Sequence, residues 1–265
     1  MDNHPIGFFD SGAGGLTIWR ATRRLLPNES LIYLADAGHA PIGEKSPEEI
    51  RDLTTRSVRF LLGLDVKLMV IACNTATVHA IDQLRDTFPQ LPFVGVVPMV
   101  KTLTEQTRTG TIAILSTPAT ATSPYLAGLI DEFAPDKRVI NIGCDGLEEI
   151  VDTGEMGTAR VRGLLERYLA PVRESEADVV GLACTHYPFL RGRIERMLGP
   201  DVRVFDPSLP VARRVRQLLA ERDALASDDA KPTYRFYSTG DPDRFATIAS
   251  KLLRSPVEAV GYAEI

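Results

Sequence analysis

The sequence is poor in cysteine, in tryptophan and in long apolar runs. Three cysteines and one tryptophan occur in 265 residues, and no apolar run approaches the roughly 18 residues that a membrane-spanning helix needs. An odd number of cysteines without a C-x-x-C pair fits free thiols in a reducing compartment better than a disulfide framework. Histidine and cysteine show no zinc spacing, so no metal is expected. We expect a cytoplasmic protein that does not bind membranes.

Basic charge is lacking as well. The net charge is −5, and the densest basic run is Arg213, Arg214 and Arg216, on a predicted helix. This pattern is typical of a solvated helix face, whereas nucleic-acid binders usually carry a basic patch. No nucleic-acid partner is therefore expected. The N-terminus has no charged region followed by an apolar segment and a cleavage site, so no secretory signal is predicted.

Short β-branched apolar runs alternate with longer amphipathic runs along the chain. Strands are predicted at Ile6–Asp10, Ser30–Leu34, Leu68–Ala72, Phe93–Val97, Thr111–Leu115, Arg138–Asn141, Val179–Leu182, Val202–Phe205 and Tyr234–Ser238. Helices are predicted at Leu16–Leu26, Pro47–Leu64, Ala76–Phe88, Ser123–Phe133, Thr158–Ala170, Leu190–Met197, Val211–Arg222 and Asp241–Leu253. This alternation predicts an α/β fold with mainly parallel sheets.

Two features indicate a body of two lobes. The runs Val70–Thr75 and Gly181–His186 form a near-repeat, in which a cysteine ends an apolar strand and polar residues follow it. Pro98 interrupts the chain after a buried-looking strand, at a point where it can cross to a second lobe. Each half is therefore expected to carry one cysteine in the same structural context.

A cysteine between a parallel strand and a helix lies where α/β folds bind ligands. The helix N-terminus favours a thiolate and predicts a lowered thiol pKa, and it also attracts substrate carboxylates. Asn74 and Thr75 after Cys73, and Thr185 and His186 after Cys184, can cap a helix or donate to an anionic ligand. Cys144 lacks this context, and a structural role is predicted for it.

A glycine-rich segment, Asp10–Gly15, follows the first strand and opens a helix. It is not a dinucleotide fingerprint, because Thr17 occupies the third glycine position. Its backbone N–H groups can still approach a small ligand. Asp10 can accept a proton, hold an ammonium group or simply cap the helix. The segment Gly38–Ser46 nearly spells a phosphate-binding loop, but Glu44 separates its glycine from the lysine and excludes that function.

Two thiols at one site suit racemisation. The reaction needs a base on one face of a carbon acid and an acid on the other, and a thiolate and a thiol can exchange these roles. Nucleophilic catalysis by a Cys–His pair is the alternative, and His186 could serve it beside either cysteine. A hydrolase or decarboxylase of that kind needs only one thiol.

These motifs resemble those of glutamate racemases, within the aspartate/glutamate racemase superfamily. Asp10–Leu16 is similar to the first motif of that family, and Ala72–Ala76 and Cys184–Pro188 are similar to its two cysteine motifs. The resemblance runs nearly end to end, through the segments Thr117–Thr120, Phe205–Ser208 and Ser238–Asp241.

The resemblance implies two similar α/β lobes with the substrate between them. The first would comprise residues 1–97 and 208–265, and the second residues 98–207. It implies Cys73 and Cys184 as the acid/base pair, assisted by Asp10 and His186 respectively. The residues that would hold an amino-acid substrate are Asp10, Ser11, Asn74, Thr75, Thr185 and His186, with backbone contacts from Ile42 and Gly43. No cofactor is implied, and the family's usual role is to supply D-glutamate for peptidoglycan. A homodimer is a possible assembly.

Two residues depart from the family's pattern. Ile42 stands where tyrosine is usual and lacks its hydroxyl group. Asp152 stands roughly where a glutamate supports the second cysteine, and its side chain is shorter. Substrate identity therefore stays open: the alternatives are a racemase for aspartate or another amino acid, and an inactive binding protein of the same fold.

Overall fold

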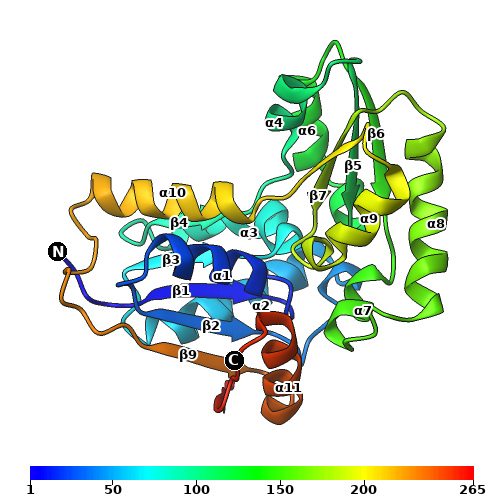
Figure 1. Cartoon of the computed structure of the whole chain (residues 1–265). Helices are drawn as coiled ribbons and strands as arrows, with labels where there is room; N and C mark the ends of the chain where they lie inside the picture. The colour runs from blue at the N-terminus through cyan, green and yellow to red at the C-terminus, as the bar shows by residue number, and fades with distance from the viewer.

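The computed structural model describes residues 1–265 and contains two parallel sheets (Figure 1). Their strand orders are β10-β9-β2-β1-β3-β4 and β6-β5-β7-β8. The strands are β1 Ile6–Asp10, β2 Leu31–Ala35, β3 Leu68–Ile71, β4 Phe93–Gly95, β5 Thr111–Ser116, β6 Arg138–Gly143, β7 Val179–Ala183, β8 Arg203–Phe205, β9 Tyr234–Ser238 and β10 Val260–Tyr262. Every pairing between strands is parallel, which confirms the predicted fold class.

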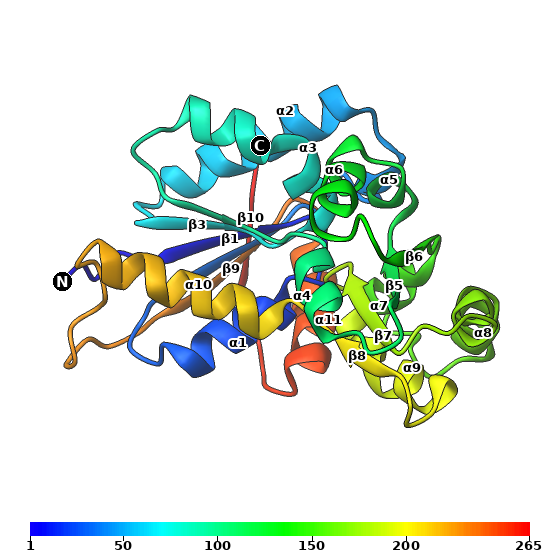
Figure 2. The same ribbon diagram turned by 90° about the horizontal axis from the view of Figure 1, so that it is seen from above.

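Helices cover both faces of each sheet. In the first lobe, α2 and α3 lie on one face, and α1, α10 and α11 lie on the other (Figure 2). The helices are α1 Leu16–Leu25, α2 Pro47–Leu62, α3 Asn74–Thr87, α4 Val100–Gln106, α5 Pro118–Ala121, α6 Pro124–Phe133, α7 Leu147–Asp152, α8 Ala159–Arg173, α9 Arg191–Leu198, α10 Ser208–Glu221 and α11 Pro242–Leu253. Two short 3₁₀ turns, η1 Ile42–Glu44 and η2 Tyr187–Leu190, complete the fold.

Burial on both faces explains why the central strands are continuously apolar. Every residue of β1, β2, β3 and β7 is buried, as expected for parallel strands covered by helices on two sides. The edge strand β6 has no fully buried residue. The apolar runs in the sequence therefore identify the middle of each sheet.

Four elements were not predicted from the sequence: α4, α5, α7 and β10. Each spans only three to seven residues. Periodicity needs a window of 11 or more residues to be recognised, so elements of this length give no pattern. The omission of α7 matters most, because this helix carries Asp152.

The chain passes between the lobes twice. It leaves the first sheet after β4 and returns from the second after β8 (Figure 1). We propose boundaries in these connections, with residues 1–97 and 208–265 in one domain and residues 98–207 in the other. In parallel sheets the carboxyl ends of all strands lie at one edge, and ligands bind there.

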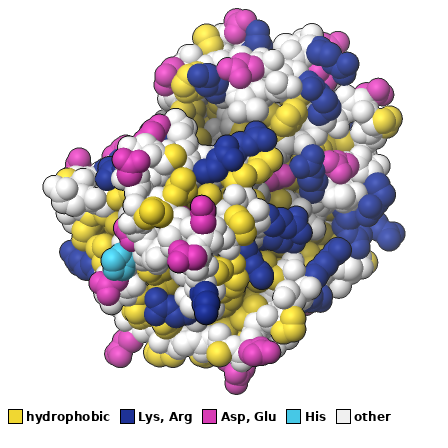
Figure 3. Space-filling view, turned by 60° about the vertical axis from the view of Figure 1, so that its left-hand side comes forward, with side chains coloured by type: hydrophobic (Ala, Val, Ile, Leu, Met, Phe, Trp, Pro, Cys, Tyr) yellow, Lys and Arg dark blue, Asp and Glu magenta, His cyan; other side chains and the backbone are white.

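The basic run in the sequence lies on the surface of α10. Arg213, Arg214 and Arg216 are exposed, and Arg214 lies 3.8 Å from Glu221 in an ion pair. Basic and acidic side chains are interspersed on the face shown in Figure 3. These arginines thus form a solvated face, as predicted. None of the helices combines the length and the apolar character needed to cross a membrane.

A buried ion pair fixes the end of the first sheet opposite the strand carboxyl ends. Lys67 Nζ lies 2.6 Å from Glu29 Oε2, and both side chains are almost completely buried. The same ammonium group donates to the carbonyl oxygens of Asp2 and Ala224, while Glu29 accepts from the N–H of Ala226. The pair and its hydrogen bonds thereby join four segments that are distant in the sequence.

Removing the ammonium group should be costly, because it leaves a buried carboxylate without its cation. We expect Lys67→Met to lower the free energy of unfolding by about 3–5 kcal/mol, measured by urea denaturation. The control is Arg85→Met, which breaks an exposed ion pair with Asp82 and should cost less than about 1 kcal/mol. Equal losses in the two variants would contradict a stabilising role for the buried pair.

Candidate active site

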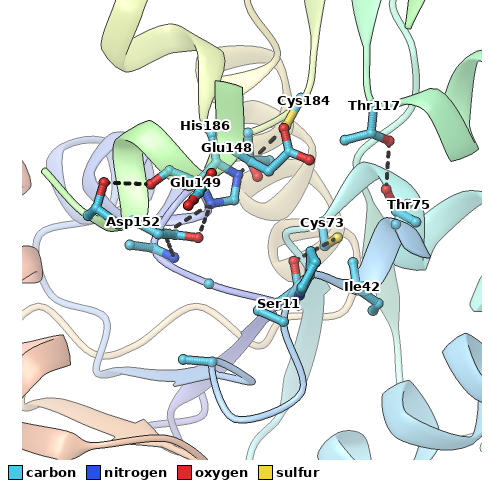
Figure 4. A pocket seen from close by; sticks show the side chains of 18 of the residues that line it. Ser11, Ile42, Cys73, Thr75, Thr117, Glu148, Glu149, Asp152, Cys184 and His186 are labelled. Atoms are coloured by element: carbon cyan, nitrogen blue, oxygen red, sulfur yellow. Dashed lines mark hydrogen bonds and ion pairs between the residues drawn. The ribbon is translucent and has the colours of Figure 1, made fainter. Parts of the chain in front are cut away.

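A cavity of about 580 Å³ lies between the lobes, at the carboxyl ends of β1 and β3 in one sheet and of β5 and β7 in the other. All the predicted site residues except Asp10 line it: Ser11, Ile42, Gly43, Cys73, Asn74, Thr75, Asp152, Cys184, Thr185 and His186. Asp10 is fully buried behind this surface. The structure therefore gathers residues from both lobes at one cavity (Figure 4).

Cys73 lies at the junction of β3 and α3. Its backbone is extended and its Sγ accepts a hydrogen bond from the N–H of Ala76 at 3.4 Å, so the cysteine itself caps the helix. Ser11 Oγ, from the loop after β1, lies 3.6 Å from the same sulfur. Cys73 is only 5% exposed. Its thiol is held in one orientation by two hydrogen-bonding groups.

Cys184 follows β7 and occupies the matching place in the second lobe. Its Sγ lies 3.6 Å from Nδ1 of His186, and both side chains are buried. The residues after it form the 3₁₀ turn η2 and then α9, rather than a single helix that begins at once. His186 is thus the immediate neighbour of Cys184, the cysteine that the resemblance implied it assists.

The predicted lowering of the thiol pKa values is wrong for this cavity. Burial, followed by the charge of Asp10, raises the pKa of Cys73 to about 12, against the smaller effects of the Ala76 and Ser11 hydrogen bonds. Burial also raises the pKa of Cys184, although the hydrogen bond from His186 opposes it. Loss of water around a thiolate outweighs the stabilisation from a helix N-terminus. Burial therefore favours the protonated form of both thiols.

His186 is bound on its other side by Asp152. Nε2 of the imidazole lies 3.1 Å from each carboxylate oxygen of Asp152. Burial by itself lowers the pKa of His186, but the charge and hydrogen bond of Asp152, together with Cys184, raise it well above the usual value. The imidazolium form places a positive charge beside Cys184. The aspartate is long enough for this contact, despite being shorter than glutamate.

Asp152 also connects the two lobes. Its Oδ1 accepts a hydrogen bond of 2.9 Å from the N–H of Ala13, in the glycine-rich loop of the first lobe. A Cβ atom on Gly12 would lie 2.6 Å from Asp152 Oδ2, and one on Gly14 would lie 2.5 Å from His186 Nδ1. Real Cβ atoms do not approach other atoms so closely. The glycines in this loop are therefore required for the contact between lobes.

Buried polar atoms without partners lie next to Cys73. Asp10 Oδ2 accepts from the N–H of Gly15 and the hydroxyl of Tyr33, whereas Asp10 Oδ1 has no partner. Both polar atoms of the Asn74 amide are buried and unpaired. Burial raises the pKa of Asp10, although the charge of His186 opposes this effect. Unsatisfied groups of this kind indicate a polar ligand.

Several side chains that line the cavity were not predicted as site residues, and Thr117 and Glu148 are two of them. Thr117 follows β5, and its Oγ1 lies 3.0 Å from Oγ1 of Thr75 in the other lobe. Its position just after a predicted strand could have identified Thr117 as a site residue. Glu148 lies on α7 beside Cys184 and His186 (Figure 4). The sequence carried no signal for it, because α7 was not predicted.

Cys144 does not line the cavity. It is buried, and its Sγ contacts the carbonyl oxygen of Ile142 at 3.7 Å. Its own carbonyl oxygen accepts a hydrogen bond of 2.8 Å from the buried hydroxyl of Tyr187. These contacts agree with the structural role predicted for this cysteine.

Replacing Asp152 tests the state of His186. In Asp152→Asn the raising charge is lost and burial remains, so the pKa of His186 should fall below its usual value of about 6.5. NMR titration of the imidazole measures this shift, and His79 in α3 provides a resonance that should not change. In the unaltered protein the His186–Asp152 pair stabilises the folded state fully below about pH 6.5, the usual pKa of histidine. This stabilisation is lost as the pH rises through the raised pKa of His186 in the folded state. A His186 pKa that does not move would contradict the pairing.

Comparison with known proteins gives a consistent result. The model of the Asp/Glu/Hydantoin racemase family matches residues 17–215. A glutamate racemase from Stutzerimonas stutzeri is 44% identical over 244 residues, which is 92% of each chain. One from Herpetosiphon aurantiacus is 43% identical over 248 residues, covering 94% of this chain and 97% of that protein.

Solved structures of other proteins match the fold of this chain over its whole length. A glutamate racemase isoform from Bacillus anthracis has a TM-score of 0.92 and 30% identity, covering 100% of this chain and 99% of its own. The Francisella tularensis enzyme, solved in complex with D-glutamate, has a TM-score of 0.89 and 30% identity, with 100% and 98% covered. The resemblance inferred from the sequence motifs is thus confirmed, and the chain belongs to the Asp/Glu/Hydantoin racemase family.

Proposed function

We propose that this protein interconverts L- and D-glutamate without a cofactor, with Cys73 and Cys184 as the two acid/base groups. The observation that carries this proposal is that the two buried thiols, from matching places in the two lobes, line one cavity. The relatives that are named glutamate racemases support the choice of substrate. So do the glutamate racemase structures from Francisella tularensis, in complex with D-glutamate, and from Escherichia coli, in complex with L-glutamate.

The reaction requires one proton transfer on each face of Cα. One cysteine, as a thiolate, removes the Cα proton, and the other, as a thiol, delivers its proton to the opposite face. Asp10, whose raised pKa brings its carboxylate closer to a thiol in basicity, assists Cys73. The imidazolium of His186, held by Asp152, stabilises the thiolate of Cys184. Cys73 is thus assisted by a carboxyl group, and Cys184 by a cation.

Substrate binding relies on neutral donors more than on cations. Arg244 is the only lysine or arginine among the residues that line the cavity. We propose that the carboxylates and the amino group are held by Asp10, Ser11, Asn74, Thr75, Thr185 and His186, and by the backbone of Ile42 and Gly43. The free Oδ1 of Asp10 and the free amide of Asn74 support this assignment. Ile42 is buried at the start of η1, where its backbone can contribute without a hydroxyl group.

A racemase for aspartate or another amino acid is the second candidate. Ile42 favours it, since this residue lacks the hydroxyl that the family's tyrosine provides. An inactive binding protein is the third, and the presence of both cysteines at the cavity argues against it. We further propose that the protein acts in the cytoplasm and supplies D-glutamate for peptidoglycan.

Exchange at Cα identifies substrate and reaction together. The purified protein, dialysed against a chelator, is incubated in heavy water with individual L- and D-amino acids, and deuterium at Cα is measured by mass spectrometry. We expect exchange with both enantiomers of glutamate. Exchange only with aspartate would favour the second candidate. Activity that returns only with a metal or pyridoxal phosphate would refute cofactor independence, and no exchange at all would favour a binding protein.

Separate replacement of the two cysteines tests the mechanism. Cys73→Ser and Cys184→Ser should each nearly abolish racemisation, because a hydroxyl group is far too weak an acid to replace a thiol. Elimination from an analogue with a good β-leaving group needs only one deprotonation at Cα. Each variant should therefore still process one enantiomer of that analogue, and the two should prefer opposite ones.

Cys144→Ser is the matched control for these variants. It changes the one cysteine that lies outside the cavity, so racemisation should persist. The two-thiol mechanism is wrong if both cavity variants process the same enantiomer of the analogue. It is equally wrong if either variant retains full racemase activity.

A further inference from the structure

A carboxyl group in the cavity has no part in the mechanism above. Glu148 precedes Asp152 by one turn on α7 and lines the same cavity. Its side chain lies beside Cys184 and His186 (Figure 4). Its Oε2 atom is buried and has no hydrogen-bond partner. A buried polar atom left unpaired is costly, typically about 1–3 kcal/mol, so a ligand is expected to satisfy it.

The neighbouring carboxylates on α7 are already paired. Asp152 contacts His186 and the N–H of Ala13. Glu149 is exposed and forms an ion pair with Arg160. Glu148 alone among these three points an unpaired oxygen at the interior. Its position is therefore not explained by the stability of the helix.

The surroundings of Glu148 favour its neutral form. Burial raises the pKa of this carboxyl, and the charges of Asp145 and Asp152 add to the effect, whereas His186 lowers it. The only cation among these groups, His186, is already engaged by Asp152 and Cys184. The titratable groups that face Glu148 are Asp145 and Asp152 on its own segment, Cys144 after β6, and Cys184, His186 and Tyr187 after β7. An ionised Glu148 would also raise the pKa of Cys184.

We propose that Glu148 is protonated in the resting protein and donates a hydrogen bond through this carboxyl to a carboxylate of the bound amino acid. The inference rests on the proposed function for the identity of that ligand. A substrate with two carboxylates enters a cavity lined by only one arginine, so neutral donors reduce repulsion. The ammonium group has another acceptor, the free Oδ1 of Asp10. Glu148 is thus a binding residue that favours dicarboxylic amino acids.

Two substitutions separate a neutral donor from an ionised carboxylate. Glu148→Gln keeps the size of the side chain and an N–H donor, so the KM for glutamate should stay within about threefold. Glu148→Leu removes the donor, and KM should rise about tenfold, with a smaller change in kcat. In the unaltered protein, KM should rise as the pH rises through the raised pKa of Glu148, because the carboxylate formed then repels the substrate. This rise should be absent in Glu148→Gln.

Infrared spectroscopy tests the protonation state without reference to activity. The C=O stretch of a protonated carboxyl group should be present at neutral pH and lost in Glu148→Gln. Glu149→Gln is the matched control, because that carboxylate is ionically paired and exposed, and the band should persist. Calorimetry with D-glutamate supplies the binding constants for each variant.

Several results would overturn the assignment. If Glu148→Gln weakens binding as much as Glu148→Leu, an ionised carboxylate is required. If Glu148→Leu binds D-glutamate as the unaltered protein does, the side chain does not contact the ligand. If the infrared band is not lost in Glu148→Gln, the group is not protonated. Absence of racemisation in the unaltered protein would instead refute the proposed function, while the spectra and calorimetry would still decide the role of Glu148.

Discussion

The carboxylate of Asp152 joins the two lobes at the cavity. It accepts the N–H of Ala13 from the first lobe and holds His186 within the second. Through His186 it sets the charge beside Cys184, whose thiol is buried. The lobes can meet here only because Gly12 and Gly14 have no side chain. The glycine-rich loop thus forms part of the junction between the lobes, where one carboxylate both orients His186 and contacts the first lobe.

The electrostatics of the cavity follow from burial. Removal of water raises the pKa values of Cys73, Cys184, Asp10 and Glu148, because each becomes charged on losing a proton. His186 is the exception, since Asp152 pairs with it directly. The raised pKa values favour the neutral forms of these four groups, which lie near the His186–Asp152 ion pair. Neutral forms of these groups reduce the repulsion of an anionic amino acid in a cavity that only one arginine lines.

The two halves of the cavity are alike in topology and different in chemistry. Each thiol follows a central strand of a parallel sheet. Cys73 contacts a serine hydroxyl and a helix N–H, whereas Cys184 contacts an imidazole. In the proposed mechanism the reaction takes place on both faces of one carbon, and each lobe supplies the thiol for one face. The similarity of the folds places one cysteine at the same point of each lobe, and different local residues contact each thiol.

The sequence by itself determined the α/β class, the two lobes and the two cysteine motifs. Long buried strands and amphipathic helices leave periodic patterns, and a strand followed by Cys-Asn-Thr or Cys-Thr-His marks a carboxyl end where ligands bind. Only the tertiary structure decided the rest. It showed that Asp152 reaches Ala13 and that Glu148 has an unpaired oxygen in the cavity. It also reversed the direction of the thiol pKa shifts. These properties depend on distances across the lobes and on exclusion of water, and neither is encoded in the local sequence around a residue.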